Sequence, residues 1–174
     1  MARLPYPEET GDAGIAELAD QIRAERGGKL PNLYRMLLNS PPVASGWLNF
    51  LTAIRQKASL SGKLRELVIL RIALVNRADY EYAAHTPFAL KEGLSQEKID
   101  ALPNWLESDV FDGTECAVLA YADAMTKAVQ VSDAVFDAAA RRLNAREMTE
   151  LTATIAAYNL VSRFLEAIKI DPEH

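Results

Sequence analysis

The stretch Leu64-Arg-Glu66-Leu-Val-Ile-Leu-Arg-Ile-Ala73 is the most apolar segment of the chain, and it decides the fold. Its apolar residues do not alternate with polar ones as they would on a half-buried strand. Ser61 stands just before it, where a hydroxyl can cap a helix. A helix that is apolar nearly all round has to be covered by other elements. We therefore predict a central, buried helix from Gly62 to about Val75.

The rest of the chain also has helical patterning. Its eight glycines and eight prolines lie mostly between the apolar segments, and no segment shows the period-2 pattern of a strand. We predict an all-α fold with about eight or nine helices around a central buried helix pair. Besides the central one, the predicted helices cover about residues 12–26, 31–38, 43–58, 79–93, 95–102, 114–129, 132–143 and 145–168. Asp79 can cap the helix that ends at Gly93, and Asn144 and Glu147 have the spacing of a capping box at the last helix.

Length and charge limit the possible classes of protein. The 174 residues fit one domain over 1–174, with the stretch 103–113 as a hinge at most. The net charge of −5 argues against nucleic acid or an anionic membrane as a partner. The longest apolar stretch, Leu67 to Val75, contains Arg71 and is too short to span a bilayer. The first ten residues have no apolar core for a signal peptide, so we expect a cytoplasmic protein.

The clearest candidate for chemistry is the pair Glu81 and His85. The chain has two histidines, and His174 is the last residue, so imidazole chemistry depends on His85. Residues four apart share a helix face, and a carboxylate there can orient the imidazole and raise its pKa. The alternative is an ordinary surface pair that stabilises the helix by a few tenths of a kcal/mol.

The neighbours of this pair favour a site. Phe88 continues the same face, which is therefore partly apolar. Pro87 lacks the N–H that a continuous helix needs, so we expect a kink or a restart just past His85. A structural explanation is equally open, in which Thr86 caps a new turn that begins at Pro87.

Glu66 is the third candidate because it lies within the predicted central helix. A buried carboxylate costs several kcal/mol unless it is paired or protonated. Arg65 or Arg71 could neutralise it, which would be a structural role. Otherwise its pKa would be raised, as is typical of functional sites.

Other chemistries find little support. The Glu81–His85 spacing offers two metal ligands where zinc sites use three or four protein ligands, so we expect no metal and no organic cofactor. The single cysteine, Cys116, excludes an internal disulfide or a C-x-x-C pair, and we interpret it as a small buried hydrophobe.

Taken in order, these motifs resemble the carboxymuconolactone decarboxylase and AhpD-like alkylhydroperoxidase superfamily. Besides the stretches above, the resemblance rests on segments along nearly the whole chain. These segments are Gly28-Lys-Leu-Pro-Asn-Leu-Tyr34, Leu90-Lys-Glu-Gly93, Glu115-Cys-Ala-Val-Leu-Ala-Tyr-Ala-Asp123 and Ile155-Ala-Ala-Tyr158-Asn-Leu-Val-Ser-Arg163. The resemblance implies an AhpD-like helical domain of the long-form, cysteine-less branch.

The resemblance also separates two activities. The peroxidase branch carries Glu, then C-x-x-C, then His, and Glu66 and His85 match its Glu and His. Its cysteines would fall on Ala78 and Glu81, so an alkylhydroperoxidase or peroxiredoxin-like antioxidant activity is disfavoured. The decarboxylase branch resembles this chain more, with an aromatic residue and Glu before the His.

The resemblance therefore implies a cofactor-free lyase or isomerase acting on a small carboxylated or lactone substrate. His85 would carry the proton, with Glu81 as its orienting partner and Glu66 as a second relay carboxylate. Tyr158, Arg163 and Trp105 are candidate substrate-binding residues. Family members form symmetric homo-oligomers, so we expect a trimer or hexamer. A non-catalytic, oligomeric ligand-binding scaffold is the remaining alternative.

Overall fold

The computed structural model describes residues 1–9 and 12–173, and it is all-α as predicted, with no strand among these residues. The helices are α1 (Ala13–Glu25), α2 (Asn32–Leu37), α3 (Pro41–Thr52), α4 (Gly62–Asn76), α5 (Asp79–Lys91), α6 (Gln96–Ala101), α7 (Gly113–Ala128), α8 (Asp133–Ala140) and α9 (Ala145–Ile168). Two compact units are distinguished by their internal contacts. One comprises residues 1–57 and the chain from Phe164 onward, and the other runs from Ala58 to Arg163. The single domain over 1–174 stays a prediction.

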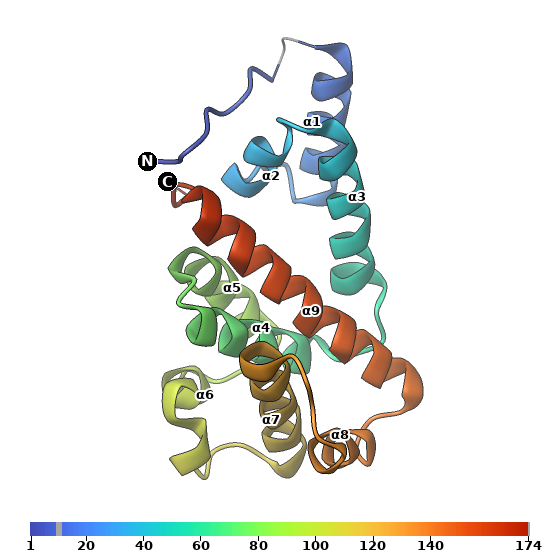
Figure 1. Ribbon diagram of the computed structural model, residues 1–174, viewed down its shortest axis with the longest axis vertical. Coiled ribbons are helices and arrows are strands. Elements are labelled where there is room, and N and C mark those ends of the chain that lie inside the picture. The colour runs from blue at the N-terminus through green and yellow to red at the C-terminus, as the bar shows by residue number, and fades with distance from the viewer. Residues whose placement is uncertain (10–11, 174) are drawn as a thin grey trace. The chain divides into compact units, whose positions relative to one another are not determined.

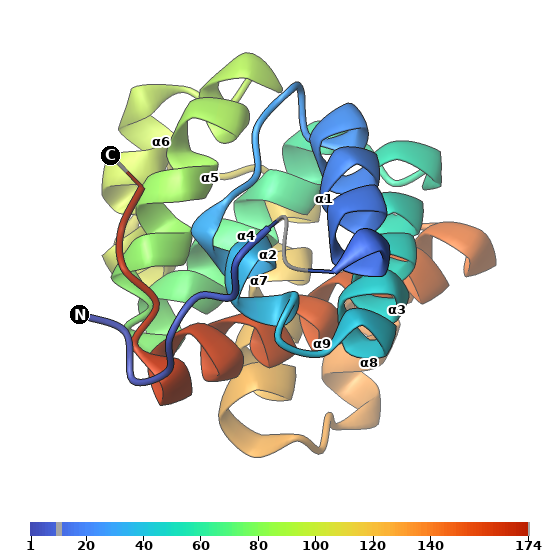
Figure 2. The ribbon, with the colours of Figure 1, turned by 90° about the horizontal axis from the view of Figure 1, so that it is seen from above.

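In the first unit, α1 and α2 both pack against α3, and Figure 2 shows α1 lying beside α3. Asp12 caps α1 by accepting from the N–H of Gly14 at 2.8 Å. The helix stops where Gly27 and Gly28 adopt positive φ angles of 66° and 83°. The helix predicted over 43–58 is not one continuous α-helix in the structure. Regular α-helix ends at Thr52, and a π-helical segment, Ala53–Lys57, follows.

The second unit is built on the predicted central helix. α4 makes its main contacts with α5 and α7 (Figure 1), and every residue from Arg65 to Ala73 is buried. Ser61 caps α4 as predicted, since its hydroxyl accepts from the N–H of Leu64 at 3.2 Å. The apolar segment therefore forms the core helix of this unit because it has no face suited to water.

The helix that carries His85 departs from two expectations. The N-cap of α5 is Ala78, so Asp79 is the first helical residue and not the cap. An acidic side chain at this position is still stabilised by the positive end of the helix dipole. The helix also continues through Pro87 without a restart. Thr86 does not cap a new turn, because its hydroxyl donates to the carbonyl of Tyr82 at 2.8 Å.

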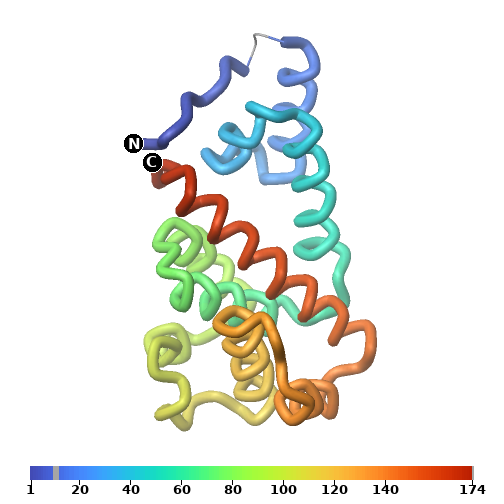
Figure 3. The backbone as a smooth tube through the Cα atoms, in the orientation of Figure 1, coloured from blue at the N-terminus to red at the C-terminus, as the bar shows by residue number. Residues whose placement is uncertain are grey.

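A 3-10 segment, Leu102–Glu107, occupies part of the predicted loop at 103–113. α7 then starts with a capping box between Asp112 and Glu115, which the sequence reading missed. The connection from α7 into α8 can be followed in Figure 3. The capping box predicted at α9 is confirmed, since Glu147 N–H donates to Asn144 Oδ1 at 3.0 Å and Asn144 N–H to Glu147 Oε2 at 2.9 Å.

A buried ion pair joins α4 to α7. Arg71 Nε and Nη2 donate to the two carboxylate oxygens of Asp123 at 2.6 and 2.8 Å, and Arg71 Nη1 donates to the carbonyl of Leu102 at 3.0 Å. A bidentate pair of this kind fixes the relative rotation of two helices, because both partners lose their bonds if either helix turns. Within the described residues, no helix is both long and apolar enough to cross a membrane.

Candidate active site

The three predicted acid–base residues meet in the second unit. Glu66 comes from α4, and Glu81 and His85 come from successive turns of α5. His85 Nδ1 lies 2.6 Å from Glu66 Oε2, and His85 Nε2 lies 3.1 Å from Glu81 Oε1. Each ring nitrogen of the imidazole therefore faces its own carboxylate, and we call these three residues the acid–base cluster.

The acid–base cluster is almost inaccessible to solvent. The exposed fractions are 1% for Glu66, 4% for Glu81 and 5% for His85. Burial by itself lowers the pKa of His85, since it disfavours a charged ring. The carboxylates of Glu81 and Glu66 outweigh burial and raise the pKa of His85 above its ordinary value. The imidazole therefore holds its proton more firmly than a free histidine does.

Glu66 also has a second cationic partner. Arg65 Nε donates to Glu66 Oε1 at 3.2 Å, and Arg65 Nη2 lies 3.4 Å from Glu92 Oε1. Of the two arginines proposed to neutralise Glu66, Arg65 takes this place, whereas Arg71 pairs with Asp123. Glu92 was not predicted here. It lies 27 residues from Arg65 in the sequence, so no local spacing could indicate the contact.

Two aromatic rings flank the imidazole. Tyr158 of α9 meets it edge to face, with ring centroids 5.0 Å apart and planes at 86°. Phe88 lies 5.7 Å away on the same helix face as His85, as its spacing predicted. Tyr158 is fully buried, whereas Phe88 is 44% exposed. Phe88 thus contacts both the ring of His85 and solvent.

The other residues proposed to bind substrate take part in different networks. The indole Nε1 of Trp105 donates to Asp123 at 3.3 Å, beside the Arg71 ion pair. Arg163 Nη1 donates to the carbonyl and the side-chain oxygen of Asn159 at 2.9 and 2.8 Å. Cys116, which was not proposed to bind substrate but was expected to be a small buried hydrophobe, is only half-buried, and its Sγ lies 3.7 Å from the carbonyl of Phe111. Of the proposed binding residues, Tyr158 is therefore the one that contacts the acid–base cluster.

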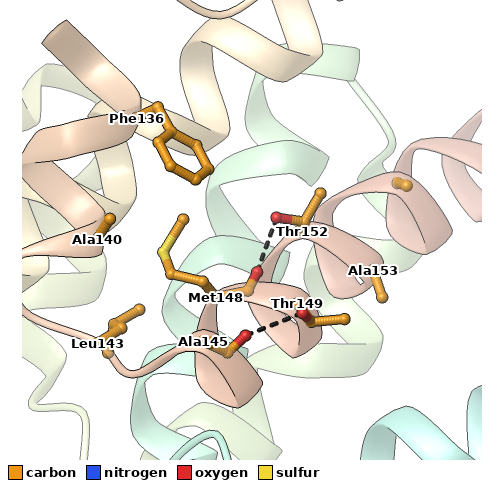
Figure 4. A pocket seen from close by; sticks show the side chains of 9 residues that line it. Phe136, Ala140, Leu143, Ala145, Met148, Thr149, Thr152 and Ala153 are labelled. Atoms are coloured by element: carbon orange, nitrogen blue, oxygen red, sulfur yellow. Dashed lines mark hydrogen bonds between the residues drawn. The ribbon is translucent and has the colours of Figure 1, made fainter. Parts of the chain in front are cut away.

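An open apolar groove of about 690 Å³ runs along α8 and the first half of α9 (Figure 4). Its walls include Phe136, Leu143 and Met148. The polar residues in it are Thr149 and Thr152, and each hydroxyl donates to the carbonyl four residues earlier in α9. The groove therefore offers apolar contact without an acid, a base or a nucleophile.

Residues 41–124 match the family model of the carboxymuconolactone decarboxylase family, and this range includes all three residues of the acid–base cluster. Uncharacterized protein YnjA of Escherichia coli (strain K12) is 28% identical over 144 residues, which cover 82% of this chain and 74% of YnjA.

Solved structures with 19–22% sequence identity share the fold. An AhpD-core, peroxidase-related protein from Ralstonia eutropha JMP134 superposes with a TM-score of 0.84 at 21% identity, over 99% of this chain and 92% of that one. Protein ATU0492 of Agrobacterium tumefaciens, a putative antioxidant defence protein AhpD, gives 0.74 at 22% identity, over 79% and 95%. The debrominase Bmp8 in complex with 2,3,4-tribromopyrrole gives 0.80 at 19% identity, over 96% and 89%. The chain is thus similar to the carboxymuconolactone decarboxylase family over residues 41–124, around the acid–base cluster, and it shares the AhpD-like fold of these solved structures.

Proposed function

We propose that this protein is a cofactor-free lyase or isomerase that moves protons on a small carboxylated or lactone substrate. The proposal is carried by one observation, the imidazole of His85 held between two buried carboxylates at 2.6 and 3.1 Å. A proton can pass between the imidazole and a neighbouring carboxylate without a metal or an organic cofactor, because the imidazole can both donate and accept a proton. The family match around the cluster supports the same class of chemistry.

The chemistry that these residues suit is protonation at carbon. When a carboxylated lactone loses CO2, the electrons of the broken C–C bond move into the adjacent unsaturated carbonyl system, which becomes an enolate. The cluster donates a proton to the enolate carbon, the carbonyl reforms, and the cluster regains a proton from water. Overall, the substrate loses its carboxylate as one CO2, and one proton is consumed to form one C–H bond. An isomerase would use the same donor and return the proton to the same cluster.

The acid–base cluster supports this proposal better than the apolar groove does. The groove has no ionisable side chain among its lining residues, so it can bind but cannot transfer a proton. Reduction of a peroxide by the cluster itself is also disfavoured. Ala78 and Glu81 occupy the positions at which the peroxidase branch carries cysteines, and that reaction needs a thiolate.

The test is turnover of γ-carboxymuconolactone and related carboxylated lactones by the wild type and by His85→Gln. Gln keeps the size and polarity of the side chain but cannot carry a mobile proton. We expect a loss in kcat of about 10²- to 10⁴-fold, as is typical for an acid–base group. His174→Gln is the matched control, and it should retain wild-type turnover. Equal turnover by the wild type and His85→Gln on every substrate consumed would exclude the proposed role of His85.

A second candidate function is a non-catalytic ligand-binding scaffold. Two observations favour it, the near-complete burial of the acid–base cluster and the open apolar groove along α8 and α9. In that case no lactone is turned over, whereas apolar ligands raise the melting temperature of the wild type. Phe136→Ala would then abolish the thermal shift, and His85→Gln would leave it unchanged.

A further inference from the structure

The two carboxylates of the acid–base cluster are not equivalent. Glu66 faces two cationic groups, with Oε1 at 3.2 Å from Arg65 Nε and Oε2 at 2.6 Å from His85 Nδ1. For Glu81, His85 is the one cationic side chain within ion-pair distance among the described residues, at 3.1 Å. The negative charge of Glu66 is therefore stabilised from both sides, and that of Glu81 from one side.

Arg65 is itself held in place from outside the cluster. Its guanidinium lies between Glu66, which is buried, and Glu92, which is partly exposed at the end of α5. The Glu92 carboxylate packs directly on the backbone of Gly62, where a β-carbon would overlap with it. Glycine at residue 62 therefore lets Glu92 approach α4 closely enough to reach Arg65.

We propose that Arg65, held by Glu92 on Gly62, fixes Glu66 as the orienting carboxylate of the cluster and leaves Glu81 to exchange protons with the substrate. Arg65 is thus a positioning residue that acts through Glu66. The catalytic part of this assignment, proton exchange between Glu81 and a substrate, rests on the proposed function. The effect of Arg65 on the proton held by His85 does not depend on any substrate.

The proposal sets the direction of proton transfer. The proton on His85 Nε2 passes to the Glu81 carboxylate, and the resulting carboxylic acid donates it to the substrate carbon. Glu66 orients the imidazole through Nδ1 and takes no part in the transfer. One proton taken up from water restores His85. The reacting atom of the substrate is therefore expected beside Glu81 and not beside Glu66.

The test measures the protonation of His85 in full-length protein by NMR of its imidazole C–H groups, assigned by comparison with His85→Gln. Glu66, Glu81 and the Tyr158 ring of α9 contact the imidazole directly. Two further charged groups, Arg65 and Glu92, lie behind Glu66. Arg65→Gln removes a positive charge from this set, so protonated His85 becomes more favourable. We expect its pKa to rise by about 1 to 3.

Two further variants separate positioning from loss of structure. Arg65→Lys keeps the charge and should return the pKa of His85 close to the wild-type value. Gly62→Ala changes no charge but displaces the Glu92 carboxylate from Arg65, so the positive charge of Arg65 is less compensated. The pKa of His85 should then fall, by less than it rises in Arg65→Gln. Gly46→Ala is the matched control, because a β-carbon there meets no atom within 4 Å.

The outcomes distinguish this inference from the proposed function. If Arg65→Gln leaves the pKa of His85 at the wild-type value, the role of Arg65 is overturned even when the enzyme turns over lactones. If Arg65→Gln does not fold, the role of Arg65 is overturned when the pKa of His85 in Gly62→Ala equals that in Gly46→Ala. A raised pKa with rescue by Lys supports the role of Arg65 even when no substrate is found. On an active enzyme, Arg65→Gln should lower kcat by up to about 100-fold with little change in KM.

Discussion

His85 Nδ1 and Glu66 Oε2 are 2.6 Å apart, although the two residues are 19 positions apart in the sequence and lie on different helices. The contact is buried, short and charge-assisted, which places it among the stronger hydrogen bonds that proteins form. It converts the local pair of Glu81 and His85 into a cluster with a carboxylate on each ring nitrogen. The chemistry proposed above depends on this relationship between α4 and α5.

The raised pKa of His85 predicts a pH dependence of stability. A histidine with a higher pKa in the folded protein stabilises it fully below the unfolded pKa of about 6.5, and this contribution is lost as the pH rises through the folded value. The free energy of unfolding should therefore fall as the pH rises above about 6.5. Urea unfolding at a series of pH values measures this slope. In His85→Gln the part of the slope due to this residue should vanish, and an unchanged slope would contradict the expectation.

The buried ion pair of Arg71 with Asp123 should matter more for stability than exposed pairs do. Asp123→Ala leaves the Arg71 guanidinium buried without its carboxylate, so we expect a loss of about 3–5 kcal/mol in the free energy of unfolding. Asp20→Ala is the control, because its pair with Arg23 has the same charges but the Asp20 side chain is 79% exposed, against 12% for Asp123. The control should cost less than about 1 kcal/mol. Similar losses in both variants by urea unfolding would show that burial of the pair contributes nothing.

Peroxide reduction should be absent in the wild type and should be gained when thiols are introduced. The double variant Ala78→Cys, Glu81→Cys places a thiol four residues before His85, which can activate it as a thiolate. In the presence of dithiothreitol, one peroxide is reduced to an alcohol and water while the two thiols form a disulfide that the reductant reopens. Peroxide consumption is followed spectrophotometrically. Cys116→Ser serves as the control, and a wild type that consumes peroxide in a Cys116-dependent manner would refute the expectation.

Phe88 is expected to limit access to the acid–base cluster, because its ring lies against His85 while nearly half of its surface faces solvent. Phe88→Ala should speed deuterium exchange at the C2 carbon of the His85 imidazole, read by mass spectrometry of the peptide that contains it. Phe136→Ala is a closely matched control, since Phe136 is also 44% exposed but lines the groove of α8 and α9. Equal exchange rates in both variants would mean that Phe88 does not restrict access.

Local sequence chemistry predicted much of this structure. The central helix, its Ser61 cap and the capping box of Asn144 and Glu147 all depend on residues within one or two turns of each other, so they could be read directly. Local rules also failed in places. Pro87 was expected to break or restart its helix, but α5 continues through it, and Asp79 was expected as a cap but is the first helical residue. In both cases the packing of α5 on α4 outweighs a local preference that favours a different boundary.

The sequence by itself determined that the chain is helical, that the segment forming α4 is a buried core helix, and that Glu66, Glu81 and His85 are the candidate acid–base residues. These conclusions follow from periodicity and from the cost of burying a charge, which are properties of the residues themselves. Only the tertiary structure decided that Glu66 faces His85, that Arg65 and not Arg71 pairs with Glu66, and that Glu92 reaches Arg65 across Gly62. Two of these contacts, Glu66 with His85 and Glu92 with Arg65, join α4 to α5 or to the end of α5. The way in which two helices pack is set by side chains along the whole length of both, so no local stretch of sequence predicts such contacts.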